Sequence, residues 1–197
     1  MDINRLNNLL CDEHGQFTEK TQSSKLIYDG AIVHLYKDTV TLPDGKSAIR
    51  EVIRHVGAVC VVPVTDDGEV ILVRQFRYPL GKMVLEIPAG KLNSKDEDPA
   101  SAVLRELEEE TGYSCRELNF IGDIHTTVGF CDEVIHMYSA YGLTKGISHP
   151  DDDEFIDTVK LPLEEAAEMI LNGQLTDGKT QAAILKVYID RKRREQR

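Results

Sequence analysis

Cysteine is scarce and scattered in this sequence. The 197 residues include four cysteines, at positions 11, 60, 115 and 131, and none of them forms a C-x-x-C pair. None of the six histidines lies at a zinc-like spacing from these cysteines. The pattern excludes a recognisable zinc site and favours reduced thiols, most of them in the core.

Long apolar runs are also missing. The opening MDINRLNNLLCDEHGQ has no apolar signal core, and no apolar run approaches the length needed to span a membrane. We therefore expect a cytoplasmic protein with no membrane partner.

Basic charge is in deficit, with 23 lysines and arginines against 34 acidic residues and a formal net charge of -11. Phosphate backbones are held by clustered lysine and arginine, so a nucleic-acid partner is not expected. The basic run Arg191 to Arg194 ends a helix-like C-terminus, where cations complement the helix dipole. We interpret this run as structural.

What remains is the composition of a compact protein, 41% hydrophobic and 29% charged. The hydrophobic pattern predicts one main α/β domain over residues 55–197 and an antiparallel-strand extension over residues 1–54. The expected strands and helices cover residues 24–53 on either side of a turn at 42–45, a hairpin of 58–65 and 70–76, strands at 83–87, 118–126, 134–141 and 155–161, and helices at 163–171 and 179–192.

The segment GKLNSKDEDPASAVLRELEEETGY, residues 90–113, carries the strongest functional signal. Asp98 followed by Pro99 is typical of an N-cap with proline at the first helical position, and Gly112 is typical of a helix end. The sequence therefore predicts a helix from Pro99 to Thr111. At about 100° per residue, one stripe of this helix is apolar and faces the core. That stripe is formed by Ala100, Val103, Leu104, Leu107 and Thr111.

Glu106, Glu109 and Glu110 lie beside this stripe on a face that we expect to be open to solvent. Glutamates three and four residues apart on a helix repel one another, and Arg105 can offset only part of that repulsion. A hard divalent cation with oxygen ligands would neutralise such a cluster. The alternative is a solvated acidic helix face.

The arrangement resembles the Nudix box, in which a glycine and a glutamate precede the pattern Arg-Glu-apolar-x-Glu-Glu-x-Gly-apolar. Residues 105–113, RELEEETGY, match that pattern in order. Six residues rather than five separate Gly90 from Glu97, so that counting from the glycine selects Asp96. We prefer Glu97, because an extra loop residue before a helix costs less than a shift within it. The resemblance implies a Nudix-type α/β/α sandwich with a mixed sheet, plus an N-terminal β-hairpin extension.

The resemblance also implies a ligand set for Mg²⁺, with Mn²⁺ as an alternative. This set comprises Glu106, Glu109, Glu110 and the backbone carbonyl of Ala89, with Glu97 in a bridging or outer role. Arg105 would orient a glutamate rather than touch the substrate.

Four further segments look like those of ADP-ribose pyrophosphatases within that family, namely residues 74–79, 86–90, 129–133 and 151–155. The resemblance implies hydrolysis of the pyrophosphate bond of ADP-ribose to AMP and ribose 5-phosphate. It also implies a homodimer built with the N-terminal strands, whose exchange between subunits stays open.

A mobile acidic loop or a box glutamate supplies the general base in that family. The resemblance makes Glu154 the first candidate, Asp153 the second, and Glu109 the box alternative. Arg77 and Arg50 are candidates for phosphate contacts, since guanidinium groups pair well with phosphate oxygens. A further candidate is Glu133, for a ribose hydroxyl. The alternatives are a solvated acidic turn for the loop and surface positions for the others.

Thr127-Val128-Gly129 stands where the family usually has a proline-containing turn. Substrates such as GDP-mannose, other nucleoside-diphosphate sugars or dinucleotides therefore stay open as alternatives. A nucleotide-sugar sensor that binds without cutting and an RNA end-processing enzyme are further alternatives.

Residues 173–180, GQLTDGKT, also satisfy the G-x-x-x-x-G-K-T pattern of a phosphate-binding loop. A helix-like segment precedes them, whereas such a loop must follow a strand. We interpret Gly173 as a helix C-cap and Asp177 as the N-cap of the next helix.

Overall fold

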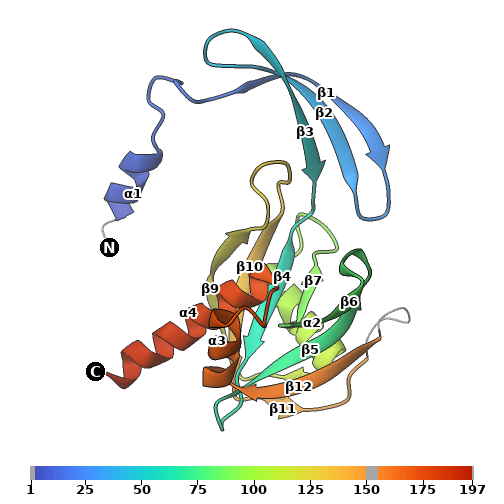
Figure 1. The fold of residues 1–197 in the computed structure, drawn as a ribbon, viewed down its shortest axis with the longest axis vertical. Coiled ribbons are helices and arrows are strands. Elements are labelled where there is room, and N and C mark those ends of the chain that lie inside the picture. The colour runs from blue at the N-terminus through green and yellow to red at the C-terminus, as the bar shows by residue number, and fades with distance from the viewer. Residues whose placement is uncertain (1–2, 150–154, 197) are drawn as a thin grey trace. The chain divides into compact units, whose positions relative to one another are not determined.

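The computed structural model describes residues 3–149 and 155–196, and it divides into two units. One unit comprises Met1–His55 with Thr127–Asp132, and the other comprises Val56–Thr126 with Glu133–Arg197. In chain order the elements are α1 (Ile3–Leu10), β1 (Lys20–Asp29), β2 (His34–Thr41), β3 (Ser47–Arg54), β4 (Ala58–Pro63), β5 (Glu69–Arg77), η1 (Tyr78–Leu80), β6 (Lys82–Glu86), β7 (Ala89–Lys91), α2 (Pro99–Thr111), β8 (Tyr113–Ser114), β9 (Glu117–His125), β10 (Val134–Tyr141), β11 (Thr144–Lys145), β12 (Ile156–Pro162), α3 (Leu163–Leu171) and α4 (Gly178–Glu195) (Figure 1).

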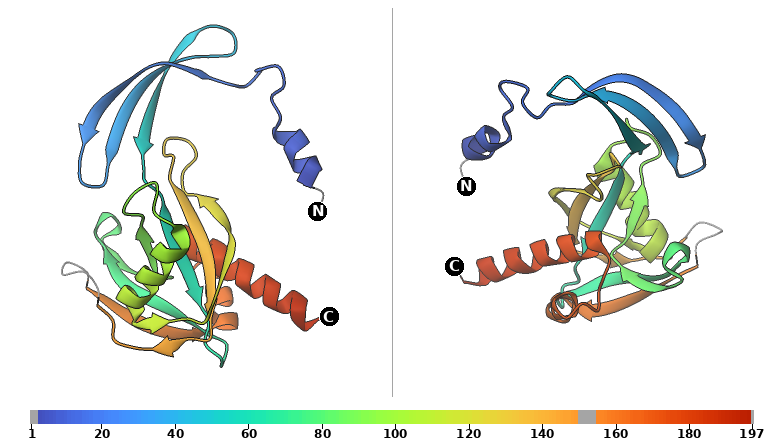
Figure 2. Two further views of the ribbon diagram at one scale, coloured as in Figure 1. Left: turned by 180° about the vertical axis from the view of Figure 1, so that it is seen from behind. Right: turned by 45° about the horizontal axis from the view of Figure 1, so that its top comes forward.

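The N-terminal unit is built on a three-stranded antiparallel sheet, β1-β2-β3 (Figure 2). The turn predicted around Leu42-Pro43-Asp44-Gly45 joins β2 to β3, and Gly45 takes a positive φ of 83° there. The sequence pattern indicated strands on both sides of this turn but not the separate strand β1. Asp38 of β2 is buried and accepts hydrogen bonds from Ser24 Oγ and Arg54 Nη2.

The second unit is organised around β4, which lies inside the mixed sheet β7-β4-β10-β9. β4 pairs parallel with β10 and antiparallel with β7, while β9 pairs antiparallel with β10. A three-stranded sheet, β12-β5-β6, and a two-stranded pair, β11-β8, complete the unit.

All six residues of β4 are buried, because helices cover both faces of the strand. Val59 and Val61 pack in one cluster with residues of α2, including Leu107. The alternate residues Cys60 and Val62 pack in the other cluster with residues of α3 and α4. The predicted α/β/α sandwich with a mixed sheet is confirmed.

Helix α2 has the bounds that its sequence predicted. Asp98 caps its N-terminus by accepting a hydrogen bond from the Ser101 backbone N–H, at 3.0 Å. Gly112 ends the helix with a φ of 73°, a left-handed conformation that glycine adopts without strain. The predicted buried stripe is wrong at Leu104, which is 41% exposed, because the packed face is centred on Val103 and Leu107.

The predicted hairpin of residues 58–65 and 70–76 is also wrong. A turn at Asp66-Asp67-Gly68 does join β4 to β5, and Val64 forms an antiparallel bridge with Val70. Beyond that bridge, β4 and β5 enter different sheets. β4 pairs with β7 and β10, whereas β5 pairs with β6, the next strand along the chain, and with β12.

Among the described residues, no helix has both the length and the apolar character required to cross a membrane.

The packing of α2 on β4 predicts a contrast between two leucines of one helix. Leu107→Ala removes a fully buried side chain and should lower the free energy of unfolding by about 2–5 kcal/mol. Leu104→Ala is the matched control and should cost less than about 1 kcal/mol, because Leu104 is already 41% exposed in the folded protein. Urea denaturation of both variants measures the contrast, and equal losses would contradict the assigned packing face.

Candidate active site

The carboxylates of the box helix gather around Arg105. Its Nη1 donates to Glu106 Oε1 at 2.6 Å and to Glu109 Oε2 at 3.1 Å, and its Nη2 donates to Glu97 Oε1 at 3.3 Å. One guanidinium therefore bridges acids from the helix and from the loop before it. These contacts supply the positive charge that offsets the repulsion between neighbouring glutamates.

Glu106 lies directly against the backbone of β7. A Cβ atom built on Gly90 would stand 2.0 Å from Glu106 Cδ, a distance that no real contact allows. Glycine is therefore required at position 90 for the Glu106 carboxylate to take this position.

Glu110 lies next to Ala89, the residue before that glycine. Glu110 Oε2 accepts a hydrogen bond from the Ala89 backbone N–H at 3.0 Å. The expectation that this glutamate faces solvent is wrong, since Glu110 is only 6% exposed. The burial arises because α2 turns this side chain toward Ala89, the first residue of β7.

Glu97 is held by the loop that precedes the helix. It accepts hydrogen bonds from the backbone N–H of Asn93 and from Asn93 Nδ2. The backbone hydrogen bond from Asn93 and the nearby charge of Arg105 lower the pKa of Glu97. Asp96, the alternative from the spacing, is exposed.

The donor chemistry of this cluster suits a hard divalent cation, because it offers carboxylates beside a glycine-containing strand. Within residues 3–149 and 155–196, however, no three His, Cys, Asp or Glu side chains are arranged so that they could hold a metal ion. The side chains of Glu97, Glu106 and Glu109 are instead directed to Arg105. A cation would have to replace some of these contacts.

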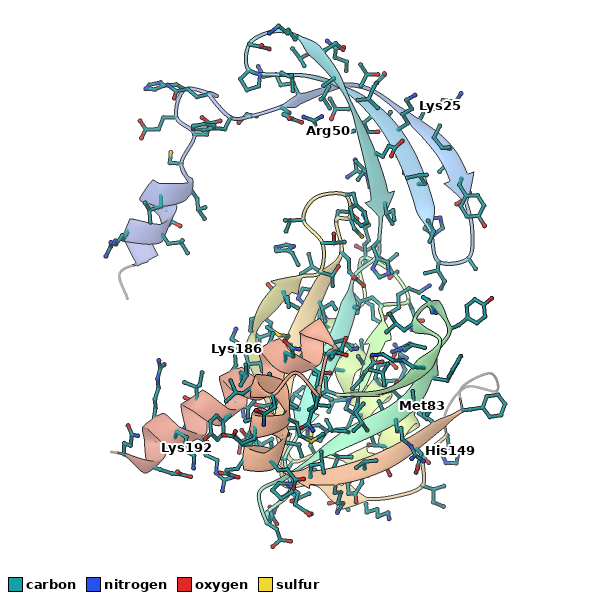
Figure 3. All side chains as sticks on the ribbon, in the orientation of Figure 1. Lys25, Arg50, Met83, His149, Lys186 and Lys192 are labelled. Atoms are coloured by element: carbon teal, nitrogen blue, oxygen red, sulfur yellow. The ribbon has the colours of Figure 1, made fainter. Side chains whose placement is uncertain are left out.

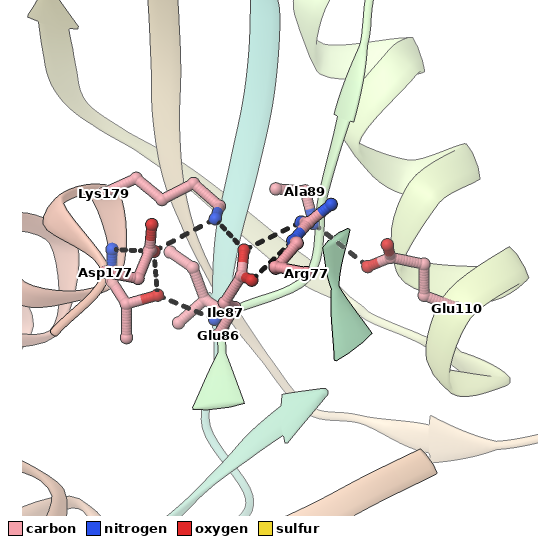
Figure 4. A network of polar contacts seen from close by, with 8 residues as sticks. Arg77, Glu86, Ile87, Ala89, Glu110, Asp177 and Lys179 are labelled. Atoms are coloured by element: carbon pink, nitrogen blue, oxygen red, sulfur yellow. Dashed lines mark hydrogen bonds and ion pairs between the residues drawn. The ribbon is translucent and has the colours of Figure 1, made fainter. Parts of the chain in front are cut away.

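A second charged network surrounds Glu86, at the end of β6 (Figure 4). Arg77 donates through Nε to Glu86 Oε1 at 2.7 Å and through Nη2 to Glu86 Oε2 at 2.8 Å. Lys179 also contacts Glu86 Oε2. Burial alone would raise the pKa of Glu86, but the hydrogen bonds and charges of Arg77 and Lys179 outweigh it and lower the pKa to about 2.

The start of α4 completes this network. Asp177 caps the helix by accepting from the Thr180 backbone N–H at 3.0 Å, and Lys179 Nζ also contacts Asp177, at 3.0 Å. Thr180 is fully buried, and its hydroxyl oxygen accepts from the Ile87 backbone N–H at 3.0 Å. The lysine and threonine of the G-x-x-x-x-G-K-T pattern thus bind other residues of the same protein. The predicted N-cap at Asp177 is present.

The remaining predicted residues are divided between the two units and the residues outside the described ranges. Arg50 lies on β3 of the N-terminal unit (Figure 3) and donates from Nε to Glu19 Oε2 at 2.9 Å. In the other unit, Glu133 accepts a hydrogen bond from Thr126 Oγ1 at 2.8 Å. Asp153 and Glu154 lie outside the described residues.

The sequence reasoning did not identify Glu86 and Lys179 as site residues. A signal was present for Glu86, which is a single acid between the apolar residues of MVLEIP. A lone acid in such a setting indicates a buried charge with a partner, because unpaired charges are rarely buried. No local signal indicates that its partner is 93 residues away.

Two family models match adjoining segments of the chain. Residues 54–183 match the NUDIX domain, and residues 19–53 match the nucleoside diphosphate sugar hydrolase N-terminal domain. The chain belongs to the Nudix family. Nudix hydrolases generally use divalent metal ions.

Relatives are similar along most of this Nudix chain. A methanol dehydrogenase activator of Bacillus methanolicus is 45% identical over 170 residues, which cover 85% of this chain and 91% of that protein. An ADP-ribose pyrophosphatase of Bacillus subtilis (strain 168) is 43% identical over 168 residues, which cover 84% of this chain and 90% of that protein.

The fold is shared with a solved structure. A crystal structure of an ADP compounds hydrolase superposes with a TM-score of 0.81, covering 90% of this chain and 96% of that chain at 18% identity. At this identity the likeness shows the Nudix fold alone.

The lowered pKa of Glu86 predicts a defined pH dependence of stability. A carboxyl whose pKa falls from 4.5 to about 2 on folding stabilises the protein above pH 4.5, and it loses that contribution as the pH falls toward 2. The difference in unfolding free energy between wild type and Glu86→Gln should be roughly 2–3 kcal/mol at pH 7 and should shrink between pH 4.5 and pH 2. Denaturant unfolding across this range measures it. A difference that stays constant down to pH 2 would contradict the assignment.

The contact between Gly90 and Glu106 predicts a variant that spares the fold. Gly90→Ala should displace the Glu106 carboxylate, which is the far end of a flexible side chain, and should therefore weaken divalent-metal binding by about tenfold or more. Thermal stability should change little. Isothermal titration with Mn²⁺ tests this, and Gly178→Ala, which meets no atom within 4 Å, is the control. Unchanged Mn²⁺ affinity in Gly90→Ala would show that this position of Glu106 is not needed for metal binding.

Proposed function

We propose that this Nudix hydrolase uses Mg²⁺ to split the pyrophosphate bond of ADP-ribose, giving AMP and ribose 5-phosphate. The observation that carries the proposal is the collection of box glutamates around Arg105, beside Ala89 and Gly90. The similarity to the Bacillus subtilis ADP-ribose pyrophosphatase supports the choice of substrate.

We assign the metal ion to Glu106, Glu109, Glu110 and the carbonyl of Ala89, with Glu97 in an outer role. When bound, the ion neutralises charge on the phosphates and lowers the pKa of water. The chain's own contribution is to hold the acids close together before the cation arrives, and Arg105 does this by pairing with three of them. Mn²⁺ is the alternative ion.

The general base in this proposal is Glu154, with Asp153 as the second choice and Glu109 as the box alternative. A base must lie within hydrogen-bonding reach of the water that it deprotonates. Glu109 is 39% exposed in its side chain and contacts Arg105, so this carboxylate is accessible from solvent.

Arg77 and Arg50 are the proposed phosphate contacts, and Glu133 is proposed for a ribose hydroxyl. Arg77 suits the part because Glu86 fixes its guanidinium while its side chain stays 41% exposed. A guanidinium that is fixed before binding loses less entropy when it pairs with a phosphate.

We also propose that the protein is a cytoplasmic homodimer. Residues 1–54 would form the dimerisation extension of a homodimer, and residues 55–197 the Nudix hydrolase domain. Exposed apolar side chains on the N-terminal strands, among them Leu26, Tyr28 and Ile49, support a partner surface there. All four cysteines are free, which supports a reducing cytoplasmic location.

A second candidate is hydrolysis of another nucleoside-diphosphate sugar, such as GDP-mannose, or of a dinucleotide. Val128 motivates it, since this residue stands where the related enzymes usually carry a proline-containing turn and is 84% exposed. An exposed side chain in a loop can contact one substrate and not another. The sugar that is cleaved fastest separates the two candidates.

The test is product analysis after incubation with Mg²⁺ and a panel of ADP-ribose, GDP-mannose, UDP-glucose, NADH and diadenosine polyphosphates. We expect AMP and ribose 5-phosphate from ADP-ribose. Glu110→Gln should lower kcat by at least about 100-fold, because an amide cannot replace a charged metal ligand. The fold should persist, since the glutamine carbonyl can still accept from the Ala89 N–H.

Glu108→Gln is the matched control, because Glu108 is an exposed glutamate of the same helix outside the assigned ligand set. It should keep near-wild-type turnover. An active Glu110→Gln enzyme would refute the metal assignment. Tight binding of ADP-ribose without cleavage by the wild type would favour the sensor alternative.

A further inference from the structure

We propose that Lys179 is a positioning residue for this reaction. It would hold Glu86, and through Glu86 the guanidinium of Arg77, in the arrangement that receives the phosphates of the substrate. The inference rests on the proposed function, because it takes Arg77 as a phosphate contact. Nothing in the box motif or in the acidic loop assigns a part to this lysine.

The contacts make Lys179 the second cation on one carboxylate. Glu86 is 4% exposed in its side chain and binds Arg77 through both oxygens, at 2.7 and 2.8 Å. Lys179 Nζ contacts one of the same two oxygens and is itself 12% exposed. A buried carboxylate held from two sides has little freedom to move, so it holds Arg77 in one orientation (Figure 4).

The charges of the network explain why a lysine is needed there. Arg77 and Lys179 carry two positive charges, and Glu86 and Asp177 carry two negative charges, so the four groups together are neutral. Without Lys179 the network would carry a net charge of about −1, beside a guanidinium that is proposed to bind an anion. A nucleoside diphosphate would then meet a repulsive field.

The backbone next to Glu86 is fixed by the same helix turn. Thr180 follows Lys179 on α4 and accepts the Ile87 N–H, while Glu110 of α2 accepts the Ala89 N–H, both at 3.0 Å. The segment from Glu86 to Ala89 is thus held by α4 on one side and by α2 on the other. Lys179 acts on the side chain of the residue at which that segment begins.

The network forms part of the wall of a cavity, so its charges face a space in which a ligand can bind. It has a volume of about 370 Å³, and its lining includes Arg77, Glu86 and Asp177 together with the apolar Leu80 and Val84. A change in the pairing of Arg77 therefore changes the charge that a bound molecule meets in this cavity.

The experiment measures steady-state kinetics of ADP-ribose hydrolysis in Lys179→Met and Lys179→Arg. The methionine removes the charge and keeps much of the apolar length, whereas the arginine keeps the charge. We expect KM to rise about tenfold in Lys179→Met with kcat within about twofold of wild type, and Lys179→Arg to restore most of the loss. Lys186→Met is the control, because Lys186 is an exposed lysine of the same helix (Figure 3), and it should leave both constants unchanged.

A double variant tests whether Lys179 acts through Arg77. Arg77→Lys should itself raise KM, and adding Lys179→Met to it should raise KM by less than the product of the two separate effects. Lys179→Gln covers the case in which the methionine variant does not fold, and the same rise in KM is expected from it. Circular dichroism melts of each variant monitor the fold.

The outcomes separate this inference from the proposed function. If the wild type cleaves ADP-ribose and KM is unchanged in the folded Lys179 variants, the inference is overturned and the function stands. A fall in kcat alone, or full additivity with Arg77→Lys, would likewise overturn it. If the wild type cleaves none of the panel, the proposed function fails and the inference falls with it.

Discussion

The second unit depends on one constraint, which is that its crowded carboxylates must be paired with positively charged side chains. The box helix places glutamates three and four residues apart, and each such pair costs a few tenths of a kcal/mol if it is left bare. Arg105 compensates the acids of the helix and loop, and Arg77 with Lys179 compensates the buried Glu86. In both places a basic side chain makes more than one contact with the acids and so holds them in position.

The strand β4 gives these charges a rigid support. Its alternate side chains pack against α2 on one face and against α3 and α4 on the other. Both helix layers are therefore positioned by contacts with the same strand. Because β7 pairs with β4, Ala89 and Gly90 are fixed by the same sheet that supports α2. The position of Gly90 on β7 relative to the glutamates of α2 is thus set by the contacts that both elements make with β4.

Local chemistry made part of this predictable from the sequence. The bounds of α2 follow from Asp98, Pro99 and Gly112, which act within the helix itself. The sheet partners of β4 could not be predicted, because a turn fixes only the residues nearest to it, and β4 pairs with β7 and β10 rather than with the strand that follows it. For the same reason the box glutamates were identified by their spacing. The ion pair of Glu86 with Lys179 joins residues 93 positions apart, so the sequence around Glu86 indicates a buried, paired acid but does not identify its partner.

The hydrogen bond between Thr180 and Ile87 joins two segments that are synthesised far apart in time. The box helix and its strand precede residue 112, yet the segment that leads into the strand is held by a hydroxyl from α4, which is synthesised many residues later. A growing chain can therefore carry every box glutamate while this contact is still missing. The backbone at Ile87 acquires this partner only when α4 has been synthesised and has packed against it.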